Sequence, residues 1–87
     1  MYVILFHFAD GRIAPYGGGT YFYRGTKYAY LDNLQTKIYS SSKIARNCAG
    51  KLVKSCANLQ NCEAIEIVEV RGNGQEKVFE RITFEAA

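Results

Sequence analysis

The 87-residue sequence contains no tryptophan, only one proline and one histidine, and no apolar run long enough to cross a membrane. A membrane-spanning helix needs about 20 consecutive apolar residues, and the longest apolar stretch, residues 2–9, is much shorter. That stretch also lacks the basic segment and the cleavage site of a signal peptide. We therefore expect a cytoplasmic protein that does not associate with membranes.

Residues for catalysis are scarce as well. Catalysis by acids, bases or nucleophiles needs a base beside its partner, or paired carboxylates in an apolar pocket. The single histidine, His7, lies in an apolar segment with neither pattern near it in sequence. The glycine-rich GGGTYF lacks the lysine and the following helix of a phosphate-binding loop. We interpret His7 as a partly buried structural imidazole, and we expect the protein not to be an enzyme.

Cysteine is too sparse for a metal site or a disulfide framework. Cys48 and Cys56 are eight residues apart in a predicted helix, which separates them by about 12 Å along the axis, too far for a disulfide. Their spacing to Cys62 does not match that of zinc ligands. We expect reduced thiols in the core, no metal and no cofactor.

Acidic residues are missing from the middle of the chain. Residues 33–62 contain five cations and no aspartate or glutamate, whereas residues 63–87 contain six glutamates and three cations. Such asymmetry predicts a basic helix surface. The cations of this surface are Lys43, Arg46, Lys51 and Lys54. They form either an ordinary solvated helix face or a surface that contacts phosphates or an acidic protein.

Tyrosine, in contrast, is abundant, above all in YGGGTYFYRGTKYAYL, residues 16–31. Alternating β-forming residues predict strands at residues 20–23 and 27–31, joined through residues 24–26. Tyr21, Tyr23, Tyr28 and Tyr30 then share one face, while Phe22, Ala29 and Leu31 can serve the core. A tyrosine ring buries area while its hydroxyl stays in water, so these four rings fit a sheet face that no helix covers.

The rest of the chain predicts strands, one helix and more strands. Residues 2–9 form a strand that is apolar on both faces and therefore central. Asp10-Gly11 predicts a type I′ turn, and residues 12–14 return until Pro15 ends the pairing; YGGG is then a loop or bulge. DNLQT at residues 32–36 is a turn, and residues 37–39 are a short extended piece.

A helix follows, capped by the serines at residues 40–42 and running from residue 43 to about residue 59. Its apolar stripe includes Ile44, and Gly50 permits a close approach to the sheet. Residues 63–71 and 76–84 form strands around a GNG turn at residues 72–74. The fold class is therefore α+β in a single domain, residues 1–87: an antiparallel sheet of four or five strands with one helix packed on one face.

The segment TKIYSSSKIARNCAGKL, residues 36–52, together with the valine- and glutamate-rich strand segment EIVEV, residues 66–70, resembles small accessory proteins of phages and mobile elements. Anti-CRISPR and other anti-defence inhibitors belong to this class. The resemblance implies a protein that acts by binding and without cofactors, inside the host cell if a phage encodes it. It carries no agreed site residues to this chain.

Three functions remain open. The first is a phage-type inhibitor or adaptor that binds a host protein or ribonucleoprotein through the four tyrosines, with Arg24 and Lys27 at the rim. The second is a nucleic-acid-binding module in which the same rings stack on bases and the helix cations contact phosphates. The third is a homodimer formed through open sheet faces, in which the tyrosines are structural.

Overall fold

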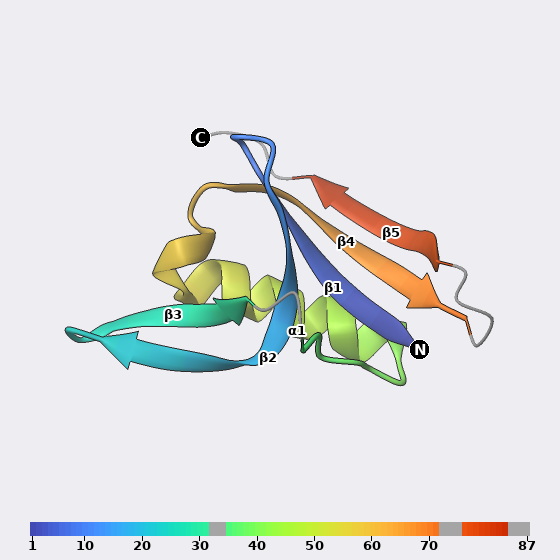
Figure 1. Cartoon of the computed structure of the whole chain (residues 1–87), viewed down its shortest axis with the longest axis horizontal. Coiled ribbons are helices and arrows are strands. Elements are labelled where there is room, and N and C mark those ends of the chain that lie inside the picture. The colour runs from blue at the N-terminus through green and yellow to red at the C-terminus, as the bar shows by residue number, and fades with distance from the viewer. Residues whose placement is uncertain (32–34, 72–75, 84–87) are drawn as a thin grey trace.

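The computed structural model describes residues 1–31, 35–71 and 76–83. Within these residues five antiparallel strands form one sheet in the order β3-β2-β1-β4-β5, and the helix α1 runs across one face of it (Figure 1). The predicted α+β class is confirmed. The turn predicted at residues 72–74 and the strand end at Phe84 lie outside the described residues, as does most of the turn predicted at residues 32–36.

The centre of the sheet is built from the two most apolar segments, β1 (Tyr2–Phe8) and β4 (Cys62–Val70). They pair antiparallel, and on one face the register sets Ile4 opposite Ile67 and Phe6 opposite Ile65. All four of these side chains are fully buried against α1. The face of the sheet that carries them is called the helix side here, and the opposite face is called the open face.

Strand β2 (Ile13–Tyr23) is longer than predicted, because it joins the two predicted segments at residues 12–14 and 20–23. Its pairing with β1 does end at Pro15. The strand continues through the glycines and pairs with β3 (Thr26–Leu31), with an irregular register between Tyr16 and Thr20. The bulge alternative for YGGG is therefore confirmed. The β2–β3 hairpin extends from the body of the molecule as an arm (Figure 1).

The two hairpin turns differ from the prediction. At residues 8–12 only Gly11 has a positive φ, and its N–H donates to Phe8 O at 3.0 Å, so the predicted type I′ turn at Asp10-Gly11 is wrong. Asp10 instead accepts a hydrogen bond from the Arg12 N–H at 3.0 Å. The type I′ conformation occurs at Arg24-Gly25, where φ is 51° and 78° and the flanking Tyr23 and Thr26 pair.

Helix α1 (Ser42–Ser55) begins at the predicted serine cluster, and Ser41 Oγ accepts from the Ile44 N–H at 3.5 Å. It ends earlier than predicted, because Cys56 adopts an extended conformation and a separate 3-10 turn, η1 (Ala57–Leu59), follows. Two other expectations also fail. Ile44 is exposed rather than part of the buried stripe, and a Cβ on Gly50 would meet nothing within 4 Å.

The last strand, β5 (Glu76–Thr83), pairs with β4 at the edge of the sheet. An irregularity opposite Ile67 and Val68 inserts Phe79 into β5. Phe79 packs edge-on against the ring of Tyr2 at a centroid distance of 5.4 Å. At the N-terminal end of the sheet Tyr2 also bridges to Tyr39, so the predicted extended piece at residues 37–39 adds a short pairing there.

Candidate functional site

The arm has two chemically different faces, because side chains alternate along each strand. Ala29 is buried in the core beside α1, so the side chains that share its face point to the helix side. The tyrosines alternate with them and point to the open face. The register confirms the predicted grouping, since Tyr21 lies directly opposite Tyr28. The set that forms this tyrosine face is Tyr21, Tyr23, Tyr28 and Tyr30.

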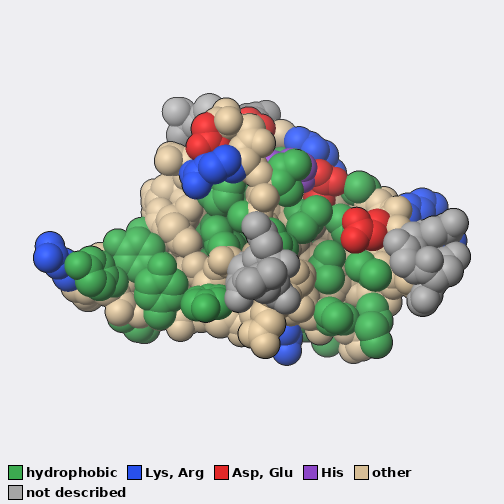
Figure 2. All heavy atoms as spheres, in the orientation of Figure 1, with side chains coloured by type: hydrophobic (Ala, Val, Ile, Leu, Met, Phe, Trp, Pro, Cys, Tyr) green, Lys and Arg blue, Asp and Glu red, His purple; other side chains and the backbone are tan. Residues whose placement is uncertain are grey.

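Three rings of the tyrosine face pack on one another rather than into the core. Tyr21 stacks on Tyr28 with a centroid distance of 5.5 Å and an interplanar angle of 19°, and it meets Tyr30 edge-on at 6.3 Å. Tyr21 is still 47 % exposed and Tyr30 51 %. Hydrophobic side chains, tyrosine included, gather along the arm in Figure 2. The three rings therefore contact one another while much of the surface of Tyr21 and Tyr30 stays in water.

The other predicted residues of the arm lie apart from this cluster. Arg24 occupies the turn at the tip, with its guanidinium 5.3 Å from the centroid of the Tyr23 ring. Lys27 pairs with Phe22, so both lie on the helix side of the arm, and Lys27 lines a hollow beside α1. Phe22 is 71 % exposed. The expectation that Phe22 serves the core is wrong, because the arm reaches beyond the helix at that point.

The four predicted cations of α1 are all exposed, as expected for the face opposite the buried stripe. Arg46 forms an ion pair with Glu80 of β5, with 3.5 Å between Nε and Oε1. Hollows flank the helix on its β5 side and on its β3 side. Arg46, Lys51 and Lys54 line the first, and Lys51 also lines the second. The tyrosine face and this basic helix surface lie on opposite sides of the sheet.

A third cluster, on the open face, was not predicted. His7 Nε2 lies against the Glu66 carboxylate, and Arg81 Nη1 donates to Glu66 Oε1 at 3.2 Å. The His7 and Glu66 side chains are only 14 % and 11 % exposed. The two residues are far apart in sequence and meet because β1 and β4 are neighbours. A single glutamate inside the apolar run AIEIV was the only sign of a partner for His7.

The cysteines lie in or against the core. Cys48, Cys56 and Cys62 are free thiols, and the last two are buried. Burial raises the pKa of Cys62, whose Sγ donates to Ala64 O at 3.1 Å. Residues 1–31, 35–71 and 76–83 contain no group of three or more histidine, cysteine or acidic side chains placed to hold a metal ion.

Neither helical segment of the described chain has the length and apolar character that a membrane crossing requires. Comparison of the chain with protein-family models, with curated proteins and with solved structures finds no match.

Proposed function

We propose that this chain is a non-enzymatic binding protein that engages a protein partner through the tyrosine face of its arm. The observation that carries the proposal is the packing of Tyr21 on Tyr28 and Tyr30 on the sheet face that α1 leaves open. Partly exposed aromatic side chains that are already ordered lose little conformational entropy on binding. They are also the residue type most often found as anchors at the centre of protein interfaces.

Charge favours a protein over a nucleic acid as the partner of this face. The residues of β2 and β3 that alternate onto it, namely Gly19, Tyr21, Tyr23, Thr26, Tyr28 and Tyr30, carry no charge. A nucleic acid stacked on the rings would need cations beside them for its phosphates. The helix cations are on the other side of the sheet, and within the described part of the arm Arg24 is the cation at the rim, near Tyr23.

The resemblance to phage accessory proteins agrees with this function and extends it. In that setting the chain is an inhibitor or adaptor, and its partner is a host protein or the protein part of a ribonucleoprotein. The tyrosines act as the desolvated anchors of the interface. No cofactor is needed, because binding alone blocks or recruits the target.

The test compares matched variants on the two faces of the same strand. A photo-crosslinking residue at position 23 should trap a defined partner, and the Tyr21→Ala/Tyr30→Ala variant should abolish trapping. Phe22→Ala, on the opposite face, is the control and should leave trapping intact. Melting curves verify that each variant is folded. A partner trapped equally by the tyrosine variant would refute the proposal.

Light scattering tests the homodimer. If wild type has twice the monomer mass and the tyrosine variant is monomeric, the rings serve self-association. If the wild type is monomeric, the tyrosine face is free for another protein.

A further inference from the structure

The exposed side of α1 forms a second surface, distinct from the tyrosine face. On its β5 side lies a hollow lined by Arg46, Gly50, Lys51 and Lys54, with Ile65 and Ile82 at its apolar wall. On its β3 side Lys51 also lines a hollow that Lys27 completes from the arm. The fold thus adds Lys27, which the sequence grouped with the tyrosines, to the cations of the helix.

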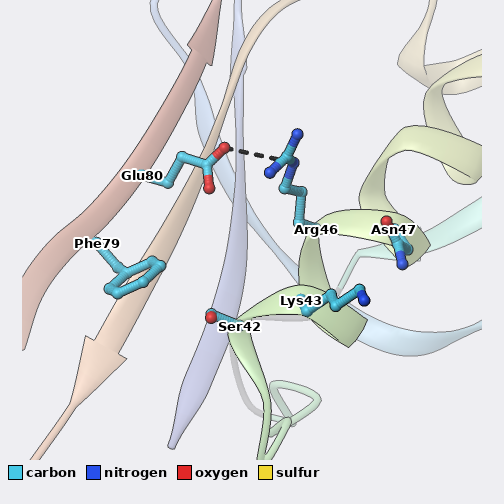
Figure 3. A pocket seen from close by; sticks show the side chains of 6 residues that line it. All are labelled: Ser42, Lys43, Arg46, Asn47, Phe79 and Glu80. Atoms are coloured by element: carbon cyan, nitrogen blue, oxygen red, sulfur yellow. Dashed lines mark ion pairs between the residues drawn. The ribbon is translucent and has the colours of Figure 1, made fainter.

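Near the start of the helix a third hollow lies between α1 and β5, with Ser42, Lys43 and Arg46 on one wall and Phe79 and Glu80 on the other (Figure 3). Asn47 lines all three hollows and adds an amide group to them. Its side chain supplies a carbonyl acceptor as well as two N–H donors, whereas an ammonium group can only donate.

This surface carries a strong excess of positive charge. Among the described residues that line the three hollows, Glu80 is the only acidic one, and it is already paired with Arg46. Within the described chain, Lys27, Lys43, Lys51 and Lys54 form no ion pair in which a carboxylate neutralises them. The sequence places no acid anywhere in residues 33–62. A chain of anions is the ligand that complements such a surface.

Gly50 supplies an independent indication. Glycine is among the poorest helix formers, and here no neighbour requires its small size, because an added Cβ would meet nothing within 4 Å. The absence of a side chain leaves the helix backbone open to the hollow between Arg46, Lys51 and Lys54. A glycine in that position allows a ligand to approach the backbone closely.

We propose that the exposed side of α1 binds the sugar–phosphate backbone of a nucleic acid, without reading its sequence. From Lys43 to Lys54 the cations extend about 16 Å along the helix axis. Along a duplex strand this is the rise of roughly five phosphates. The protein then has two binding surfaces: the open face binds a protein, and the helix side binds a nucleic acid. A ribonucleoprotein or nucleoprotein target would present both.

The probe is a fluorescent mixed-sequence DNA duplex, titrated with the intact chain and followed by anisotropy at several salt concentrations. We expect binding at low salt, with affinity falling steeply as salt rises because counterions are released. The test variant is Lys51→Gln/Lys54→Gln. It should weaken binding at least about tenfold at low salt and reduce the salt slope by about two.

The matched control is Arg12→Gln/Arg71→Gln, which removes the same net charge from residues already paired with Asp10 and Glu69. It should bind as the wild type does. Gly50→Leu should fill the hollow and weaken binding while the helix keeps its stability. The Tyr21→Ala/Tyr30→Ala variant should bind the duplex normally. The nucleic-acid proposal can therefore fail while the tyrosine proposal stands, and the tyrosine proposal can fail while the nucleic-acid proposal stands.

Three results would overturn the proposal. One is no binding of wild type at low salt, to the duplex or to a single strand of the same length. Another is an equal loss of affinity in the matched control, which would mean that net charge alone drives binding. The third is equally tight binding of polyglutamate, which would assign the surface to an acidic protein.

Discussion

The side chain of Asn58 hydrogen-bonds both backbone polar groups of Ala29. Its Oδ1 accepts from the Ala29 N–H at 2.9 Å, and its Nδ2 donates to the Ala29 carbonyl at 2.9 Å. Strand β3 is an edge of the sheet, and an edge strand exposes a row of unpaired backbone groups to other chains. Asn58 therefore takes the place of a neighbouring strand at this position. It also ties the arm to η1.

Asn58→Ala should lower the free energy of unfolding by about 1–3 kcal/mol, because two partly buried backbone groups lose their partners. Asn58→Asp should also destabilise the protein, since a carboxylate cannot donate to the Ala29 carbonyl. Urea denaturation gives both values, and amide exchange should become faster at Ala29. Asn61→Ala, an exposed asparagine nearby, is the control. Equal stability of the Asn58 and Asn61 variants would contradict this assignment.

Arg24 is the only non-glycine residue with a positive φ in the described chain. Left-handed geometry costs most residues about 1–2 kcal/mol, whereas asparagine tolerates it well. Arg24→Asn should therefore raise the free energy of unfolding by about 1 kcal/mol, and Arg24→Ala should give no such gain. If Arg24 also contacts the partner at the rim of the tyrosine face, the stabilised Arg24→Asn variant should bind it less tightly. Thermal unfolding and the crosslinking assay separate the two effects.

Two glycines should respond in opposite directions to the same change. Gly50→Ala should stabilise the protein by about 0.5–1 kcal/mol, since alanine is the better helix former and the added Cβ meets open space. Gly18→Ala should destabilise it, because Gly18 has a φ of 99° and its Cβ would lie 3.2 Å from the Lys37 side chain. Urea denaturation of both variants provides the check. A destabilised Gly50→Ala would show that the helix needs glycine for packing.

The fold followed from hydrophobic patterning more than from local turn chemistry. The run at residues 2–9, apolar on both faces, placed β1 at the centre correctly, and the serine cluster located the start of α1. The turns were harder, because Asp10-Gly11 has the stronger type I′ signal while the register of the sheet imposes that turn on Arg24-Gly25. The helix end was misplaced because an apolar stripe continues through Cys56 and Leu59, although the chain leaves the helix there.

The candidate site was predictable only where its residues are close in sequence. Alternation within one hairpin was enough to place the four tyrosines together. It could not show that Lys27 faces the helix cations, or that His7 meets Glu66 and Arg81, because these contacts depend on how distant elements are arranged in three dimensions. Alternation also placed Phe22 on the helix side of the arm correctly, but it could not show that the arm extends beyond α1 at that point. For this reason Phe22 was wrongly assigned to the core.

Two tyrosines that lie in or against the core, Tyr16 and Tyr39, should make the protein sensitive to alkali. Burial raises the pKa of Tyr16. Burial also raises the pKa of Tyr39, and so does the hydrogen bond that the Tyr39 hydroxyl donates to Cys48 Sγ at 3.1 Å. The folded state therefore keeps protons that the unfolded state loses near pH 10. Because the folded state binds more protons above that pH, the free energy of unfolding is unaffected below it and falls as the pH rises beyond it.

Urea denaturation at a series of pH values from 8 upward should show this decline. Tyr39→Phe should reduce its slope, since phenylalanine has no proton to lose in the unfolded state, even if it lowers stability at neutral pH by removing the bond to Cys48. Leu52→Val is the comparison, because it alters the same core without an ionising group and should lower stability equally at every pH. An unchanged alkaline slope in Tyr39→Phe would mean that other groups cause the loss. Ultraviolet absorbance of tyrosinate provides an independent readout, because the raised pKa values of Tyr16 and Tyr39 should delay their ionisation relative to the unfolded chain.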